Sequence, residues 1–386
     1  MKIVIYCQYL LGTGHFFRAR ELACGFTDHE VIFIAGGPAF DADYPPHVQF
    51  IQQTPLYMDE SFSYFICPDP ASDLESVKAE RKAQLLELVE LHQPDLFITE
   101  QYPFGRSAFS FELIPCFEFL QSSGNTKIIC SVRDILVQRN NQPQWEEKVH
   151  KRLARYDGVL VHSDPDYIPF IESFRSINDL DIPVWHTGFV TPNMSANLPS
   201  ASDESACLNK NSKRILCSIG GGRIGQEFLR AVVDGYLSEP ELLDYELMVF
   251  TGRLAERSVV EQLQNMAAKH DKISIQVFSS SYRSFVYSAD LICCMGGYNS
   301  CMDILSSKCS SVIYPYSENA EQRLRAEMIQ NYVPVEVIAP DALHQVGKAM
   351  VRGVSKGNRV YTDSFPDLSG VQNTMRCLEQ LVYGNE

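Results

Sequence analysis

Apolar and polar positions follow two different periods along this chain. Short apolar runs such as KIVIYCQ, EVIFIAGG, DLFITEQ, KIICSVRD and DGVLVHSD are separated by longer stretches in which apolar side chains recur every three or four residues. The short runs predict buried strands, and the longer stretches predict helices over 75–92, 111–122 and 145–156. Strand and helix alternate repeatedly, which is the pattern of an α/β fold with a mostly parallel sheet.

The alternation is interrupted once, by the small and polar stretch PNMSANLPSASDESACLNKNS. Such a composition is typical of a linker or a loop. A second series then runs through RILCSIGGG, YELMVFTG, ISIQVF, LICCMGG, SVIYPY and PVEVI, with helices expected over 228–235, 258–270 and 371–383. We therefore predict two Rossmann-like domains, over 1–195 and 213–370, with a linker over 196–212 and a C-terminal helix over 371–386.

Composition narrows the class of protein. A chain of 386 residues exceeds what one hydrophobic core usually serves, and 45% hydrophobic with 21% charged residues is typical of a globular protein. A net charge of −15 argues against nucleic acid as a partner, because that affinity rests on Lys and Arg. The 12 cysteines favour reduced thiols in the cytoplasm, since several stand singly in apolar runs and none has the spacing of a zinc site. We expect no metal and no membrane span.

Three glycine turns follow predicted strands, at 12–15, 220–223 and 296–300. In doubly wound sheets, ligands bind beyond the carboxyl ends of the strands, where helix N-termini present unpaired N–H groups. The first turn is not a dinucleotide fingerprint, because Phe17 stands where the third glycine belongs. It is either a tight turn or a site at which His15, in the first helical turn, takes a proton from a hydroxyl.

The other two turns are candidates for phosphate binding. Three consecutive glycines in SIGGGRIG are explained best where another group approaches the backbone closely, and Arg223 after them offers a fork for a phosphate. In MGGYNSCMD, the carboxylate of Asp303 can accept hydrogen bonds from a diol such as a ribose, or it can simply stabilise the start of a helix. Further on, Glu321, Gln322 and Arg325 form a polar cluster suited to sugar hydroxyls.

These residues resemble a known family. GTGHFFRA and MGGYNSCMDILSSKCSSVIYPYSENAEQRLRA resemble the two signature regions of the GT-B glycosyltransferases of family 28, which includes the N-acetylglucosaminyltransferase of peptidoglycan precursor synthesis. YCQYLLGTGHFFRARELA, with TEQYPFGR and SVRDIL, is similar to a bacterial group of predicted glycosyltransferases. The resemblance implies two Rossmann-like domains facing each other across a cleft. It also implies inverting, metal-independent transfer of a sugar from a nucleotide-diphosphate sugar, typically UDP-linked, to a hydroxyl acceptor.

The resemblance also implies site residues. The second domain would hold the donor, with the base beside Phe278 and Ser279, the ribose at Asp303 and the sugar at Glu321 and Gln322. The diphosphate would lie at Gly221, Gly222, Gly297, Tyr298, Asn299 and Ser300, and the acceptor at Gly12, Gly14, Arg18 and Arg106. The chain departs from the family at Thr191, where an arginine is expected, and at Gly222, where a serine is common. Arg223 is our candidate to replace the missing arginine.

We expect His15 to be the catalytic base, with Glu100 as the next candidate. Glu100 stands at a predicted strand end in TEQYPFGR, where it could instead cap a loop or pair with Arg106. Asp134 is a third candidate, although a structural residue in an ion pair is the favoured explanation for it.

Other functions remain open on the same residues. The chain could be a sugar-nucleotide hydrolase or epimerase, or a non-catalytic subunit that binds a nucleotide sugar. No cofactor is expected besides the donor, and the acceptor would be a small molecule or lipid-linked. The aromatic stretch PLYMDESFSYFICP could meet a bilayer or the acceptor, or be an ordinary loop. We expect a cytoplasmic protein, at most peripheral at the inner face of the membrane.

Overall fold

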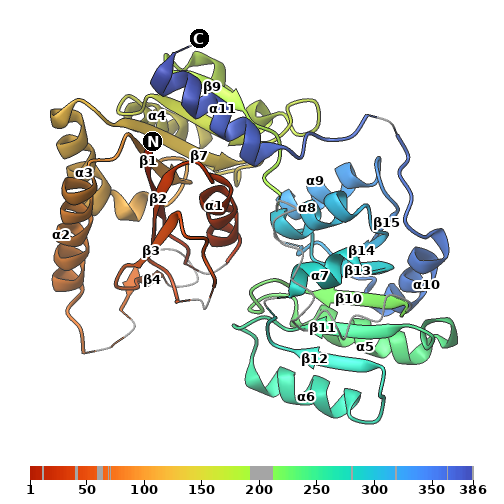
Figure 1. Cartoon of the computed structure of the whole chain (residues 1–386). Coiled ribbons are helices and arrows are strands. Elements are labelled where there is room, and N and C mark those ends of the chain that lie inside the picture. The colour runs from red at the N-terminus through yellow and green to blue at the C-terminus, as the bar shows by residue number, and fades with distance from the viewer. Residues whose placement is uncertain are drawn as a thin grey trace. The chain divides into compact units, whose positions relative to one another are not determined.

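The computed structural model describes residues 1–10, 13–39, 42–58, 64–67, 69, 71–191, 212–279, 281–317, 320–362 and 364–384. The chain divides into two units (Figure 1), which are described separately here. Unit 1 comprises Met1–Thr191 and Pro366–Glu386, and unit 2 comprises Pro192–Phe365. The predicted linker over 196–212 lies outside the described residues except for its last position. The predicted C-terminal helix is grouped with unit 1.

Unit 1 is built on a seven-stranded parallel sheet in the order β3-β2-β1-β6-β7-β8-β9. The order reverses direction between β1 and β6, which makes the carboxyl ends of these two strands a topological switch point. A short antiparallel pair, β4 with β5, lies outside this sheet. The strands are β1 (Lys2–Cys7), β2 (Glu30–Ala35), β3 (Val48–Gln52), β4 (Tyr57–Met58), β5 (Phe65–Ile66), β6 (Leu96–Glu100), β7 (Lys127–Arg133), β8 (Gly158–His162) and β9 (Val184–His186).

Helices cover both faces of this sheet. The helices are α1 (Gly14–Gly25), α2 (Leu74–His92), α3 (Ser110–Ser123), α4 (Gln142–Leu153) and α11 (Gly370–Tyr383). Alternate residues of β1 point to opposite faces, so Val4 and Tyr6 pack with α2, α3 and α4, while Ile3 and Ile5 pack with α1 and α11. A sheet buried on both faces explains why its strands read as continuous apolar runs.

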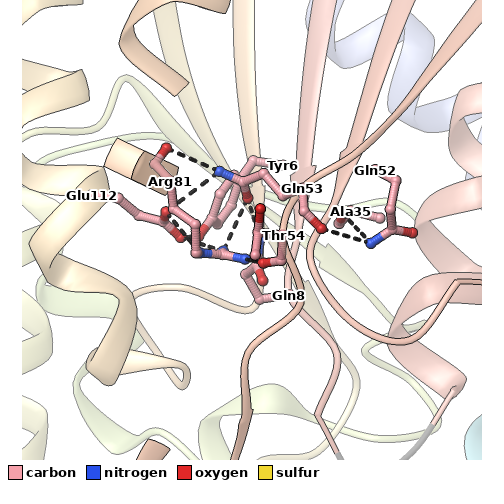
Figure 2. A network of polar contacts seen from close by, with 8 residues as sticks. All are labelled: Tyr6, Gln8, Ala35, Gln52, Gln53, Thr54, Arg81 and Glu112. Carbon is pink, nitrogen blue, oxygen red and sulfur yellow. Dashed lines mark hydrogen bonds and ion pairs between the residues drawn. The ribbon is translucent and has the colours of Figure 1, made fainter. Parts of the chain in front are cut away.

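A buried polar network ties α2 and α3 to the sheet of unit 1 (Figure 2). Arg81 of α2 forms an ion pair with Glu112 of α3 at 2.6 Å, and both side chains are fully buried. Glu112 also accepts from the hydroxyl of Tyr6 on β1, and Arg81 donates to Gln53 at 3.0 Å. Gln53 in turn accepts from the side chain of Gln8 at 3.0 Å. The network therefore fixes the residue that follows β1 at the switch point.

Unit 2 has a six-stranded parallel sheet in the order β12-β11-β10-β13-β14-β15. Its switch point lies between β10 and β13. The strands are β10 (Arg214–Ser218), β11 (Glu246–Phe250), β12 (Ile273–Gln276), β13 (Leu291–Cys294), β14 (Ser311–Ile313) and β15 (Val335–Val337). The helices are α5 (Gln226–Ser238), α6 (Arg257–Ala267), α7 (Tyr282–Tyr287), α8 (Tyr298–Ser307), α9 (Ala320–Ile329) and α10 (Val346–Lys356). α5, α6 and α10 share one hydrophobic core with the sheet, and α8 contacts both α7 and α9.

The helices agree with the sequence pattern to within a few residues at each end. The predicted helix over 145–156 is instead α4 (Gln142–Leu153), and it therefore starts and ends about one turn earlier. The largest difference is in the segment between β2 and α2, where the pattern gave no strand and the structure has β3, β4 and β5. β3 is an edge strand with mostly half-buried residues, so it lacks the apolar run that marks the central strands.

Candidate functional site

The switch point of unit 1 brings His15, Arg18 and Glu100 together. His15 and Arg18 lie in the first turns of α1, and Glu100 is the last residue of β6. His15 Nδ1 is 2.9 Å from Glu100 Oε1, and Arg18 donates to the same oxygen. The side chain of Glu100 is fully buried, whereas His15 is 16% exposed. The ion pair of Glu100 is thus with Arg18, and not with Arg106 as the sequence also allowed.

Charge and burial set the protonation of this cluster. Burial alone would raise the pKa of Glu100, but Arg18 and His15 overcome it and lower the pKa to about 2. Burial, together with Arg106 and Arg18, lowers the pKa of His15 to about 3 in spite of Glu100. At neutral pH the cluster therefore holds a carboxylate and a neutral imidazole. Because a carboxylate only accepts hydrogen bonds, Nδ1 of His15 carries the proton and Nε2 carries the lone pair.

Arg106 lies near this cluster, and Asp134 directly follows β7. Arg106 adopts a left-handed conformation with φ 57°, and its Nε donates to the carbonyl of Gln8 at 2.8 Å. Burial lowers the pKa of Arg106 to about 10. Asp134 is fully buried, and its carboxylate accepts from the amide of Ile135 at 2.9 Å. This setting agrees with a structural role for Asp134. Gly14 begins α1, whereas Gly12 lies outside the described residues.

Two glycine turns meet at the switch point of unit 2, and packing explains part of the first one. Gly222 has φ 98°, and a Cβ there would lie 2.5 Å from the carbonyl oxygen of Thr251. A Cβ on Gly252 would lie 2.4 Å from the carbonyl oxygen of Gly220. Backbone contact between the loops after β10 and β11 therefore requires Gly222 and Gly252, so close approach of another loop already explains the glycine at 222.

Gly221 and Gly297 are different, because neither the backbone nor packing requires a glycine there. Among the residues that the structure describes, a Cβ on Gly221 would meet only Leu254 at 3.9 Å, and a Cβ on Gly297 would meet nothing within 4 Å. Gly297 has an ordinary φ of −63°. Both residues follow strands that flank the switch point, β10 and β13. A glycine at such a position allows close approach of another group to the backbone.

Helix α8 begins directly after Gly297, so Tyr298, Asn299 and Ser300 form its first turn. Gly297 provides no side-chain cap, and the first turn contains no acidic residue. Such a helix start attracts an anion, because its amides point outward and the helix dipole is positive there. Asp303 lies half-buried in the second turn, close enough to Tyr282 that burial and the Asp303 carboxylate raise the pKa of that tyrosine.

The residues expected to hold the sugar already have protein partners. Glu321 is buried and forms an ion pair with Arg325 at 3.3 Å within α9. The side-chain oxygen of Gln322 accepts from the amide of Tyr316 at 2.9 Å. The start of α9 does lie beside the glycine turn, because a Cβ on Gly296 would be 3.0 Å from the carbonyl oxygen of Gln322.

The residues expected near the nucleobase of the donor lie after β12, at one edge of the sheet of unit 2. Phe278 is 41% exposed, and the guanidinium of Arg253 lies 4.3 Å from the centre of its ring. Ser279 Oγ accepts from the amide of Ser281 at 3.1 Å. Arg223 is exposed at the turn after β10. An exposed aromatic ring stacked with a guanidinium offers a flat surface for a nucleobase.

Two polar residues near the site were missed by the sequence analysis. Ser131 on β7 and His162 on β8 extend the hydrogen-bonded cluster of Glu100, with Ser131 Oγ 2.9 Å from Glu100 Oε2. The sequence does carry a weak signal, because a polar residue stands near the carboxyl end of each of these buried strands. Across the part of the chain that the structure describes, no group of three His, Cys, Asp or Glu side chains could hold a metal ion. Within the same residues, no helix is long and apolar enough to cross a bilayer.

Known proteins share both the fold and one family signature with this chain. Residues 216–368 match the glycosyltransferase family 28 C-terminal domain. No curated protein matches the chain.

Several solved structures are similar over the whole chain. A UDP-glucosyltransferase from Polygonum tinctorium has a TM-score of 0.62 at 11% identity, with 100% of this chain and 99% of that chain covered. A Listeria monocytogenes protein assigned as a UDP-N-acetylglucosamine 2-epimerase has a TM-score of 0.63 at 11% identity, covering 100% and 97%. MurG from Acinetobacter baumannii has a TM-score of 0.52 at 12% identity, covering 100% of both chains.

The whole-chain likeness at such low identity shows the fold, and it confirms the prediction of two Rossmann-like halves. The family match concerns the second half alone. The chain therefore has a GT-B fold of two Rossmann-like domains, and its second unit matches the glycosyltransferase family 28 C-terminal domain.

Proposed function

We propose that this protein is a glycosyltransferase that takes its sugar from a UDP-sugar and transfers it, with inversion, to a hydroxyl group, using His15 as the base. The observation that carries the donor half of the proposal is the pair of glycines at 221 and 297. Both stand at the switch point of unit 2, and neither is required by the fold. They leave main-chain amides open to close approach by a diphosphate.

The proposed donor site continues on either side of these amides. Asp303, one turn into α8, would accept hydrogen bonds from the ribose, and Phe278 with Arg253 would stack on the base. The names of two similar structures, a UDP-glucosyltransferase and a UDP-N-acetylglucosamine 2-epimerase, support uridine as that base. The helix start of α8 and the amides at 221 and 222 would stabilise the leaving diphosphate, so we propose a reaction without a resident metal ion.

The acceptor half of the proposal rests on His15. Its Nε2 lone pair would remove the proton from the acceptor hydroxyl as the oxygen attacks the anomeric carbon. The bond from that carbon to the diphosphate oxygen breaks with its electron pair, and UDP leaves from the opposite face. One base and one displacement give inversion. Glu100 holds the imidazole by its Nδ1 proton at 2.9 Å, and its low pKa makes it a weak base itself.

The acceptor is a hydroxyl compound, small or lipid-linked, that we assign to unit 1. Arg18 and Arg106 lie near His15 and are proposed to contribute positive charge there. Tyr64 and Ile66 of the aromatic segment are 62% and 43% exposed, which supports contact with an apolar acceptor or a membrane surface. We propose that the protein acts in the cytoplasm.

The test combines a donor screen with paired variants. The chain is incubated with UDP-sugars and candidate acceptors, and released UDP and the anomeric configuration of the product are measured. Gly297→Val should weaken UDP binding at least about ten-fold, because its side chain would occupy the space of the diphosphate. Ser258→Val, which places the same side chain in the exposed first turn of α6, should not.

Two results would contradict the proposal. Equal UDP affinity of Gly297→Val and Ser258→Val would contradict the proposed donor site. Full turnover by His15→Gln would contradict the assignment of His15 as the base, because loss of a general base should lower kcat about 10²- to 10⁴-fold.

A hydrolase or an epimerase is the second candidate, favoured by the likeness to the Listeria monocytogenes protein. UDP release that needs no acceptor would identify a hydrolase. A new sugar nucleotide without UDP release, seen by NMR, would identify an epimerase. Binding without either reaction would indicate a non-catalytic subunit.

A further inference from the structure

A line of buried hydrogen bonds continues from Glu100 across the sheet of unit 1, away from His15. Ser131 Oγ on β7 lies 2.9 Å from Glu100 Oε2 and 2.9 Å from His162 Nε2 on β8. His162 Nδ1 lies 2.8 Å from the hydroxyl oxygen of Thr187, which follows β9. Each of these four residues is 1% exposed or less. In such a site every donor needs an acceptor, so the protons are ordered.

The atom that carries the proton in each of these hydrogen bonds follows from the ionised state of Glu100. The carboxylate of Glu100 only accepts, so the single proton of Ser131 Oγ points to Glu100. Ser131 must then accept from His162, and Nε2 of His162 therefore carries a proton. His162 is neutral, since burial and Arg18 lower its pKa to about 3, so its Nδ1 accepts from Thr187. The two histidines thus hold opposite tautomers: His162 is protonated on Nε2, and His15 on Nδ1.

We propose that Ser131 and His162 are positioning residues for His15, since together they hold Oε2 of Glu100 through the hydroxyl of Ser131 and leave Oε1 for the proton on Nδ1 of His15. Arg18 also binds Oε1. A carboxylate held at both oxygens cannot rotate, and the imidazole hydrogen-bonded to it keeps Nε2 as its lone pair. This inference rests on the proposed role of His15 as the base.

Other charged and titratable groups surround the line. Those that act electrostatically on Glu100, His15, His162 or Arg106 are Arg18 on α1, Arg106 before α3, Cys7 on β1, Cys130 on β7 and Arg133 at the end of β7. The arginines favour the ionised form of Glu100 and the neutral form of both histidines. The ordered protons therefore persist across the neutral range of pH.

The first test needs no substrate. In the full chain labelled with ¹⁵N-histidine, the ring nitrogen shifts distinguish the two tautomers, and loss of signals in His15→Gln and His162→Gln assigns them. We expect His15 protonated at Nδ1 and His162 at Nε2. Either histidine in the other tautomer, or charged at pH 7, would overturn the proposal.

The second test perturbs the line at two places. Ser131→Ala and His162→Leu should lower kcat about ten- to a hundred-fold with KM unchanged, since each removes a hydrogen bond that supports a charged group. They should also shift the acid limb of the rate profile upward by about one to two pH units, because Glu100 becomes easier to protonate. His162→Gln, whose amide can still donate to Ser131, should restore most of the rate.

The matched control is Ser163→Ala, a buried serine next to His162 whose hydroxyl faces His186 at 3.5 Å. It should leave the His15 tautomer and the pH profile unchanged. If Ser131→Ala behaves like Ser163→Ala in both readouts, the positioning role is wrong. If the tautomers are as stated but His15→Gln keeps full turnover, the proposed base is wrong, and the order of the protons stands as a structural feature without a catalytic role.

Discussion

Removing Arg18 should destabilise unit 1 far more than removing a surface arginine. The side chains of Arg18 and Glu100 are 2% and 0% exposed, so Arg18→Met leaves a buried carboxylate without its main cation. Arg18 together with His15 lowers the pKa of Glu100 from 4.5 to about 2 against the effect of burial, and this net shift corresponds to ~3 kcal/mol of stability at 1.36 kcal/mol per unit. That contribution is present above pH 4.5 and is lost as the pH falls through 2.

Urea unfolding at pH 7 followed by tryptophan fluorescence measures this effect in unit 1 alone. The two tryptophans, Trp145 and Trp185, both belong to unit 1. Arg18→Met should lower the free energy of unfolding by about 3–5 kcal/mol. Arg155→Met removes a half-exposed arginine paired with Glu118 at 3.5 Å, and should cost less than about 1 kcal/mol.

The double variant Arg18→Met with Glu100→Gln separates charge from packing. With no buried charge left, it should be more stable than Arg18→Met alone. The reasoning fails if Arg18→Met costs no more than Arg155→Met, or if the double variant is the less stable of the two.

Three further predictions concern stability. Gly252→Ala should destabilise unit 2 by about 2 kcal/mol or more in calorimetry, because φ is 82° and the added Cβ would lie 2.4 Å from the oxygen of Gly220. Arg81→Met should cost about 3–5 kcal/mol in the same urea assay, since it leaves the carboxylate of Glu112 buried, and a smaller loss than for Arg155→Met would contradict this. Because the pKa of His162 is lowered from 6.5 to about 3, stability falls as the pH drops below 6.5, and His162→Gln should reduce the loss between pH 7 and pH 5 by about 2 kcal/mol.

The fold was predictable because both sheets are parallel and covered on both faces. Strands in such sheets read as unbroken apolar runs, as in KIVIYCQ and RILCSIGGG, and the glycines after them mark the turns. β3 could not be found in this way, because the edge strand Val48–Gln52 has glutamines at 49 and 52 and so lacks an unbroken apolar run.

The candidate site was predictable only in part. His15 and Glu100 stand at strand and helix ends, where the sequence shows them, but their hydrogen bond joins residues 85 positions apart. The sequence also cannot separate a glycine needed for packing, such as Gly222, from one whose neighbourhood is open, such as Gly221. That distinction depends on the loop after β11, which reaches Gly221 through the amide of Leu254 at 2.8 Å.

The central claim is that main-chain amides at the switch point of unit 2 hold the diphosphate of the donor. The most direct measurement is a crystal structure of the chain with the UDP-sugar that it binds most tightly. The account predicts diphosphate oxygens within hydrogen-bonding distance of the amides near Gly221 and in the first turn after Gly297, with the ribose beside Asp303. Diphosphate density bound elsewhere on the protein would contradict it.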